Sequence, residues 1–143
     1  MILLDTNVIS EPWKPAPSAD VVAWLDAQAI ETLFISAISV AELRFGIASM
    51  SVGRRQSILR TRFEDEVLPH FVERVMPITL STSRFYSELM AGARLSGKAI
   101  GMADGLIAAT AAERGLVVAT RDTSPFKAAG LKVINPWNGG NFG

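Results

Sequence analysis

The run Met1-Ile2-Leu3-Leu4-Asp5-Thr6-Asn7 joins an apolar segment to an acidic residue and two further polar residues. An apolar segment without polar alternation indicates a strand buried on both faces, as in a parallel sheet covered by helices. Asp, Thr and Asn are favoured at turns and helix starts, because their side chains satisfy free backbone N–H groups. The run therefore predicts a strand over 2–4 with Asp5 at its carboxyl end.

Similar short apolar runs recur along the chain and alternate with longer helical patterns. Strands are predicted over 33–35, 75–78, 116–119 and 132–134. Helices are predicted to begin at Ser18 and to cover 39–50, 53–67, 81–96 and 102–114. This alternation is typical of an α/β fold with a central parallel sheet, here of five strands. The length of 143 residues suits one domain, and the glycine-rich end over 138–143 is expected to be a flexible tail.

The composition restricts the possible chemistry. Cysteine is absent, which excludes disulfides, thiolate nucleophiles and zinc–thiolate sites. The single histidine, His70, gives little support to a serine hydrolase triad or to paired-histidine catalysis. The 14 basic residues balance the 14 acidic ones, so any contact with nucleic acid must come from a local patch.

No membrane or export segment is expected. No uncharged apolar stretch approaches the roughly 20 residues that a membrane-spanning helix needs. The short apolar run at the start has no basic region before it, unlike a signal peptide. We therefore expect a cytoplasmic protein.

Four acidic residues occupy the positions where an open parallel sheet binds its ligands. Asp5 directly follows the first predicted strand, and Asp122 lies just past the fourth. Glu42 and Asp104 fall in the first turns of two predicted helices. Ligands bind at the carboxyl ends of parallel strands, near the point where the strand order reverses. If the first and fourth strands are neighbours, Asp5 and Asp122 converge there.

Each of the four residues also has a purely local explanation. Glu42 could complete a capping box with Ser39, and Asp104 could interact with the dipole of its helix. Asp5 and Asp122 could be ordinary turn residues. The joint placement favours an acidic pocket, and clustered carboxylates stay ionised only with compensating positive charge. Mg²⁺ or Mn²⁺ would provide it, because both accept oxygen ligands and suit phosphodiester hydrolysis.

Four segments in order resemble the motifs of PIN-domain nucleases. They are residues 1–10 (MILLDTNVIS), 36–43 (SAISVAEL), 103–111 (ADGLIAATA) and 119–122 (ATRD), followed by 134–137 (INPW) at the end of the domain. The resemblance covers nearly the whole chain and is strongest to the VapC toxin family, in particular its FitB-like branch.

The resemblance implies a PIN domain, an α/β/α sandwich, with magnesium- or manganese-dependent endoribonuclease activity. It implies that Asp5, Glu42, Asp104 and Asp122 are the catalytic and metal-binding acids. It also implies a toxin–antitoxin pair in which a small DNA-binding antitoxin masks the site, together with a homodimer that forms a higher assembly with the antitoxin.

The chain departs from many VapC-like sequences at the fourth acid. Those sequences have Asn where Asp122 stands and Asp three residues later, a position that is Pro125 here. The fourth acid is therefore assigned to Asp122, as in the FitB-like pattern. Asn7, Ser39 and Thr120 occupy polar positions of the motifs, where we expect them to orient the acids or waters.

Contacts with RNA and with the antitoxin are predicted from nearby residues. RNA phosphates require cations near the acids, and the candidates are Arg44, Arg121, Arg54, Arg55 and Lys98. The helix over 39–50 carries more apolar residues than one core-facing stripe requires. Its outer side, with the helix over 53–67, is therefore predicted to receive the antitoxin, although ordinary core packing would give the same pattern. The residues concerned are Leu43, Phe45, Ile47 and Met50.

Two other functions place acids at strand ends. An aspartyl-phosphate hydrolase needs a second Asp two residues after the first, where this chain has Asn7. A phosphate receiver domain needs a Lys before a Pro late in the chain, where Asn135 precedes Pro136. A non-catalytic binding module remains a third possibility, which only an activity assay distinguishes.

Overall fold

Strand β1 (Ile2–Leu4) lies inside a sheet whose strand order is β3-β2-β1-β4-β5-β6 in the computed structural model. It pairs in parallel with β2 (Leu33–Ser36) on one side and with β4 (Val117–Ala119) on the other. Strands β3 (Val75–Met76) and β5 (Val133–Asn135) continue the parallel pairing outward. The five predicted parallel strands are confirmed, and β1 and β4 are neighbours at the switch in strand order.

Part of the segment expected to form a flexible tail is a strand in the structure. The structure describes residues 1–142, and residue 143 of the expected tail lies outside them. Residues Asn141–Phe142 form strand β6, which pairs antiparallel with β5 and follows a 3-10 turn over Pro136–Asn138. The sheet therefore has a sixth strand at its edge.

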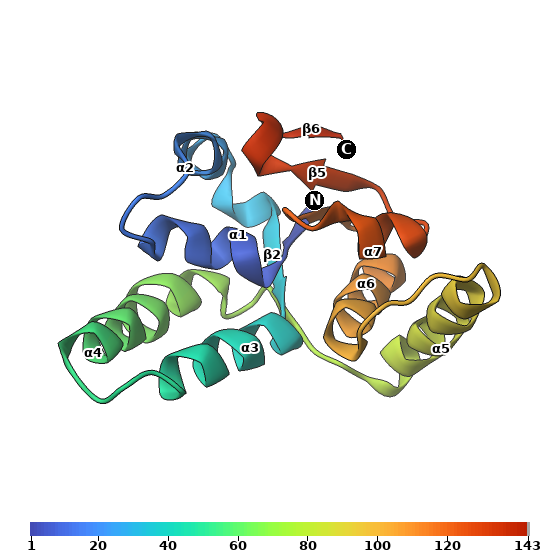
Figure 1. Ribbon diagram of the computed structural model, residues 1–143, viewed down its shortest axis with the longest axis horizontal. Helices are drawn as coiled ribbons and strands as arrows, with labels where there is room; N and C mark the ends of the chain where they lie inside the picture. Colours follow the sequence, from blue (N-terminus) through green and yellow to red (C-terminus); the bar gives the residue numbers. More distant parts are fainter. Residues whose placement is uncertain (143) are drawn as a thin grey trace.

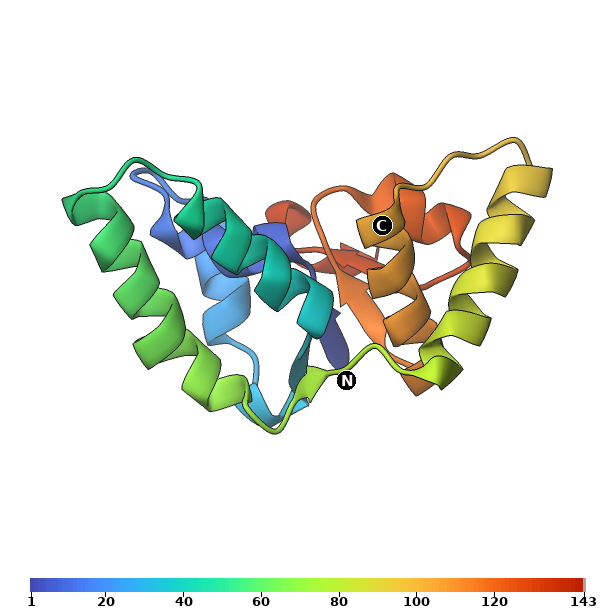
Figure 2. The same cartoon turned by 90° about the horizontal axis from the view of Figure 1, so that it is seen from below.

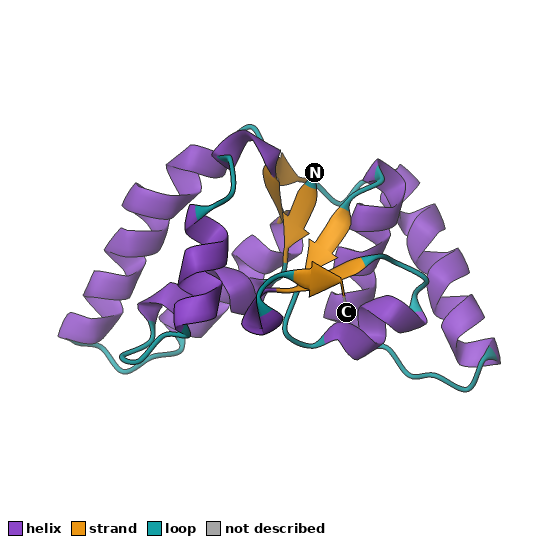
Figure 3. Cartoon of the chain, turned by 90° about the horizontal axis from the view of Figure 1, so that it is seen from above, coloured by secondary structure: helices purple, strands orange, loops and turns teal. Residues whose placement is uncertain are grey.

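Helices cover both faces of the sheet, as Figures 1, 2 and 3 show. One layer contains α1 (Thr6–Ser10), α2 (Ala19–Asp26), α3 (Ala37–Ala48) and α4 (Arg54–Thr61). The other contains α5 (Leu80–Leu95), α6 (Met102–Arg114) and α7 (Thr123–Ala128). Short 3-10 turns span Glu11–Trp13, Ile30–Thr32 and Leu68–Phe71, and a π-helical segment spans Arg62–Val67. The predicted α/β/α sandwich is confirmed.

The central strands are buried on both faces because successive side chains enter opposite layers. Leu4 and Ala119 join the core under α1 to α4, whereas Leu3 and Val118 join the core under α6 and α7. A strand that contributes to two cores has no solvent-facing side, which explains the absence of polar alternation in its sequence.

Local signals placed most helix ends within two residues. The Ser18 side chain accepts a hydrogen bond from Val21 N–H and caps α2, as predicted. Helix α6 ends at Gly115, whose φ of +64° is the left-handed conformation expected of a glycine cap. The predicted basic helix over 53–67 is instead divided into α4 and the π-helical segment. No helix within residues 1–142 is long and apolar enough to cross a bilayer.

Candidate active site

Asp5 lies at the carboxyl end of β1, where backbone groups and the side chain of Thr120 hold it in place. Its N–H donates to the carbonyl of Ala119 at the end of β4 (2.9 Å). Its Oδ1 accepts from Thr6 N–H and its Oδ2 from the Thr120 hydroxyl, both at 2.8 Å. Asp5 is only 6% exposed and Thr120 is fully buried. Because each carboxylate oxygen has two lone pairs, both oxygens keep capacity for another partner.

Glu42 is joined to Asp5 through Thr6. The Thr6 hydroxyl donates to Glu42 Oε1 (2.7 Å), and its oxygen lies 3.1 Å from Ser39 Oγ. Ser39 is buried inside α3 and does not cap that helix, because Ser36 is the N-cap and accepts from Ile38 N–H (3.1 Å). The capping-box explanation of Glu42 is therefore wrong, since α3 begins two residues before Ser39.

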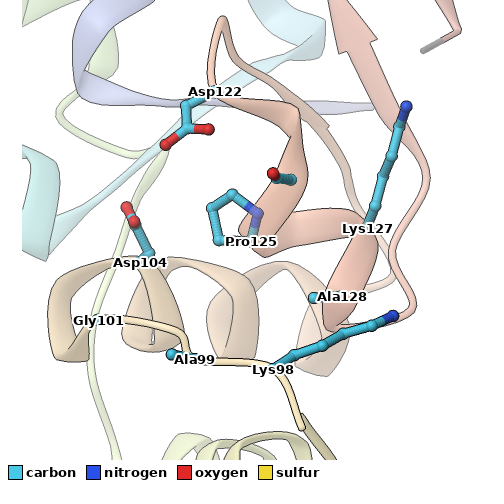
Figure 4. Close-up of a pocket in the computed structure, with 9 residues that line it drawn as sticks. Lys98, Ala99, Gly101, Asp104, Asp122, Pro125, Lys127 and Ala128 are labelled. Atoms are coloured by element: carbon cyan, nitrogen blue, oxygen red, sulfur yellow. The ribbon is translucent and has the colours of Figure 1, made fainter. Parts of the chain in front are cut away.

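Asp104 and Asp122 face each other at one end of a pocket of about 600 Å³ (Figure 4). Asp104 lies in the first turn of α6, and Asp122 directly precedes α7. Helix α6 runs opposite to the parallel strands, so its first turn lies at their carboxyl edge although it leads into β4. Asp104 is half-buried and Asp122 is exposed.

Charge interactions connect the carboxylates pairwise, and Asp104 interacts with each of the other three. Burial raises the pKa of Asp5 from its ordinary 3.8 to about 6, with smaller contributions in the same direction from the charges of Asp104 and Glu42. The hydrogen bonds from Thr120 and Thr6 act in the opposite direction. Burial also raises the pKa of Asp104, followed by the charges of Asp122 and Glu42. The four predicted acids therefore lie close enough for their charges to interact, with Asp104 common to the interactions.

The donors are all oxygen atoms, which suits a hard divalent cation. Burial is the main cause of the raised pKa of Asp5 and of Asp104, and a bound cation would favour the ionised form of both. Within residues 1–142, no three acidic or histidine side chains already form a ligand arrangement around one point. The carboxylates thus suit such a cation in donor type and lie near one another, but they do not surround a single point.

A family model for the PIN domain matches residues 2–131 of the chain. The chain belongs to the PIN-domain family. It resembles the VapC ribonuclease Y4jK of Sinorhizobium fredii, with 63% identity over 96% of this chain and 98% of that protein. It is also similar to the toxin FitB of Neisseria gonorrhoeae, with 49% identity over 96% of this chain and 99% of that protein.

A solved structure gives the same result for the fold. The FitAB structure bound to an IR36 DNA fragment matches this PIN domain with a TM-score of 0.93 and 47% identity, covering 96% of each chain. The resemblance to the VapC family and its FitB-like branch is therefore confirmed.

The predicted RNA-binding cations occupy different parts of the PIN domain. Arg44 forms a two-bond ion pair with Glu64, with Nε to Oε1 at 2.7 Å and Nη2 to Oε2 at 3.0 Å. Arg54 and Arg55 line a separate hollow beside α4. Lys98 lines the pocket that contains Asp104 and Asp122. Of these four cations, Lys98 is therefore the one that shares a pocket with the acids.

Arg121 lies beside Asp122 and is held from two sides. Its guanidinium carbon is 5.3 Å from the centre of the Trp137 ring, and its backbone N–H donates to Asn7 Oδ1 at 3.5 Å. Asn7 thus connects the start of α1 to the loop after β4, and within residues 1–142 its side chain forms no hydrogen bond with Asp5 or Asp122.

The residues predicted to contact an antitoxin divide between core and surface. Leu43 and Ile47 are buried in the core of the PIN domain, so the structure removes them from the predicted contact surface. Phe45 is 63% exposed on α3, and Met50 is half-buried beyond its end.

Two residues of the site escaped the sequence analysis. Thr6 joins Asp5 to Glu42, although its position beside Asp5 suggested only a turn or cap. Lys127 lines the acidic pocket from α7, and nothing in its local sequence separates it from an ordinary surface lysine. Both roles depend on contacts with distant segments of the chain.

Proposed function

We propose that this protein is a divalent-metal-dependent endoribonuclease that acts as the toxin of a toxin–antitoxin pair. The placement of the acids carries the proposal: Thr6 links Asp5 to Glu42, and Asp104 faces Asp122 across one end of a pocket. Membership of the PIN-domain family and the likeness to relatives named VapC ribonuclease and FitB toxin support it. A cytoplasmic location accords with this function.

Asp5, Glu42, Asp104 and Asp122 are the residues that would hold Mg²⁺ or Mn²⁺. A bound ion of this kind supplies Lewis acidity to a water molecule and positive charge to the phosphodiester. Thr120 and Thr6 orient the Asp5 carboxylate and favour its ionised form through their hydrogen bonds. The Thr6 hydroxyl fixes Glu42 at the same time.

Carboxylates are better placed than histidine to serve this chemistry. His70, the only histidine, is exposed in the turn before β3, whereas Asp5 and Asp122 follow the carboxyl ends of β1 and β4. It therefore lies toward the opposite edge of the sheet from Asp5. Hydrolysis by water at the acidic site is the mechanism that accords with this arrangement, and histidine-assisted attack by a ribose hydroxyl is not.

The antitoxin partner is proposed from the relatives. The FitAB structure on DNA supports a complex between a chain of this kind and a second protein. Phe45 is the member of the predicted contact set most available on the outer side of α3. A homodimer, and a higher assembly with the antitoxin, remain part of the proposal.

The decisive experiment is cleavage of single-stranded RNA by the purified chain. We expect cleavage with Mg²⁺ or Mn²⁺, no cleavage in EDTA, and recovery when the ion is restored. Cleavage that continues at full rate in EDTA would contradict the proposed mechanism. The Asp104→Asn variant controls for a contaminating nuclease, because it should remain folded and inactive.

A further inference from the structure

The pocket that contains Asp104 and Asp122 also contains two lysines. Figure 4 shows the two carboxylates facing each other on one side, while Lys98 and Lys127 extend along the other. Lys98 lies in the loop between α5 and α6, and Lys127 lies on α7. The pocket is therefore acidic at one end and basic at the other.

The two lysines are exposed and form no ion pair with any residue in the described part of the chain. Other cations behave differently, since Lys14 pairs with Glu11 at 2.9 Å and Arg44 with Glu64 at 2.7 Å. The acids and the lysines line the same pocket, but no lysine nitrogen there lies within 4.0 Å of a carboxylate oxygen, the limit for a salt bridge. The space between them can hold an anionic group that contacts the lysines.

We propose that Lys98 and Lys127 form a phosphate-binding subsite for the RNA strand, next to the acidic residues. This inference rests on the proposed ribonuclease function. Cleavage places one phosphate at the acidic end, and the backbone of a single strand then carries a neighbouring phosphate along the pocket. The lysines are point charges with several donors, which suits a backbone phosphate and reads no base sequence.

The subsite also compensates for the zero net charge of the chain. A neutral protein gains little general attraction for RNA, so affinity must come from placed cations. Because phosphate contacts position a strand without specifying its sequence, the lysines would set where the backbone lies relative to the acids.

The test is to measure the binding of a fluorescein-labelled single-stranded RNA heptamer by fluorescence anisotropy, in EDTA and at several KCl concentrations. Without divalent ions, binding is measured apart from cleavage. We expect the double variant Lys98→Ala/Lys127→Ala to bind about 10-fold more weakly at low salt. The slope of log K against log salt should become shallower by about 0.7, the value for one phosphate of a single strand.

The matched control is Arg114→Ala/Lys132→Ala. These exposed cations precede β4 and β5, at the opposite edge of the sheet from the acids. The control should keep the affinity and salt slope of the wild-type chain. Equal losses in both double variants, or none in the lysine variant, would overturn the subsite.

The two proposals fail in distinguishable ways. Lysine-dependent RNA binding by a wild-type chain that never cleaves RNA would retain the subsite and remove the nuclease function. Metal-dependent cleavage by the wild-type chain, together with unchanged RNA binding by the lysine variant, would retain the nuclease function and remove the subsite.

Discussion

The two ends of the acidic site differ in how the protein holds them. At the inner end, Asp5 is buried and accepts hydrogen bonds from Thr6 and Thr120, and Thr6 also holds Glu42. At the outer end, Asp104 and Asp122 face an open pocket and have no side-chain hydrogen bond to each other within residues 1–142. Asp5 is therefore held inside the fold, whereas Asp104 is half-buried and Glu42 and Asp122 are exposed.

The largest expected difference is between Asp5→Asn and Asp122→Asn. Asp5→Asn should reduce Mn²⁺-dependent RNA cleavage by about 1,000-fold, because loss of a buried acid removes several kcal/mol of charge stabilisation. Asp122 is exposed, so Asp122→Asn should cost about 10- to 100-fold. Single-turnover cleavage rates measure both, and circular dichroism should show that both variants are folded. Equal losses would mean that burial does not separate the two ends.

The hydroxyl that orients Asp5 gives the next effect. Thr120→Val keeps the shape of the buried side chain but removes the 2.8 Å hydrogen bond to Asp5 Oδ2. Mn²⁺ affinity, measured by calorimetry, should fall about 10- to 100-fold. Thr110→Val is the matched control, because Thr110 is also buried but bonds only to the Leu106 carbonyl of its own helix. An equal loss in the control would assign the effect to general destabilisation.

The pH dependence of stability should distinguish the ends more finely. An acid whose pKa is higher in the folded than in the unfolded chain stabilises the fold at low pH. For Asp5 this stabilisation is lost as the pH rises from about 4, the ordinary pKa, through about 6, the pKa in the folded chain. The stability of metal-free Asp5→Asn relative to wild type should therefore increase by about 1 kcal/mol between pH 5 and pH 8. Urea unfolding of both chains at each pH measures this difference in the free energy of unfolding.

Two additions make this pH test specific. Mn²⁺ at pH 8 should stabilise the wild-type chain and much less the Asp5→Asn variant, since binding to the folded state raises its stability. Asp20→Asn, in the first turn of α2, should show no comparable change with pH. A relative stability that stays constant from pH 5 to pH 8 would contradict the raised pKa of Asp5.

The smallest effect concerns the contact between α6, which carries Asp104, and α5. A Cβ at Gly105, the residue after Asp104, would lie 2.6 Å from Met90 Sδ and 3.0 Å from Tyr86 Cε2 on α5. Gly105→Ala should therefore destabilise the chain by about 1 kcal/mol, with little change in cleavage. Gly92→Ala on α5 meets nothing within 4 Å and should stabilise by about 0.5–1 kcal/mol. Thermal melts of the two variants should shift in opposite directions.

Much of this molecule follows from local signals in the chain. The apolar run before Asp5 and the helix start at Ser18 depend only on neighbouring residues, and the structure has both as predicted. Local signals failed at Ser39, because Ser and Glu three residues apart fit a capping box and a buried contact with Thr6 equally well.

The sequence by itself determined the α/β order of elements and which residue types could carry the chemistry, since periodicity and cap preferences act over a few residues. Only the tertiary structure decided that β1 lies beside β4, that Thr6 joins Asp5 to Glu42, and that Lys127 shares a pocket with Asp104. Those relations join segments far apart in the chain, and packing of both cores against one sheet brings them together.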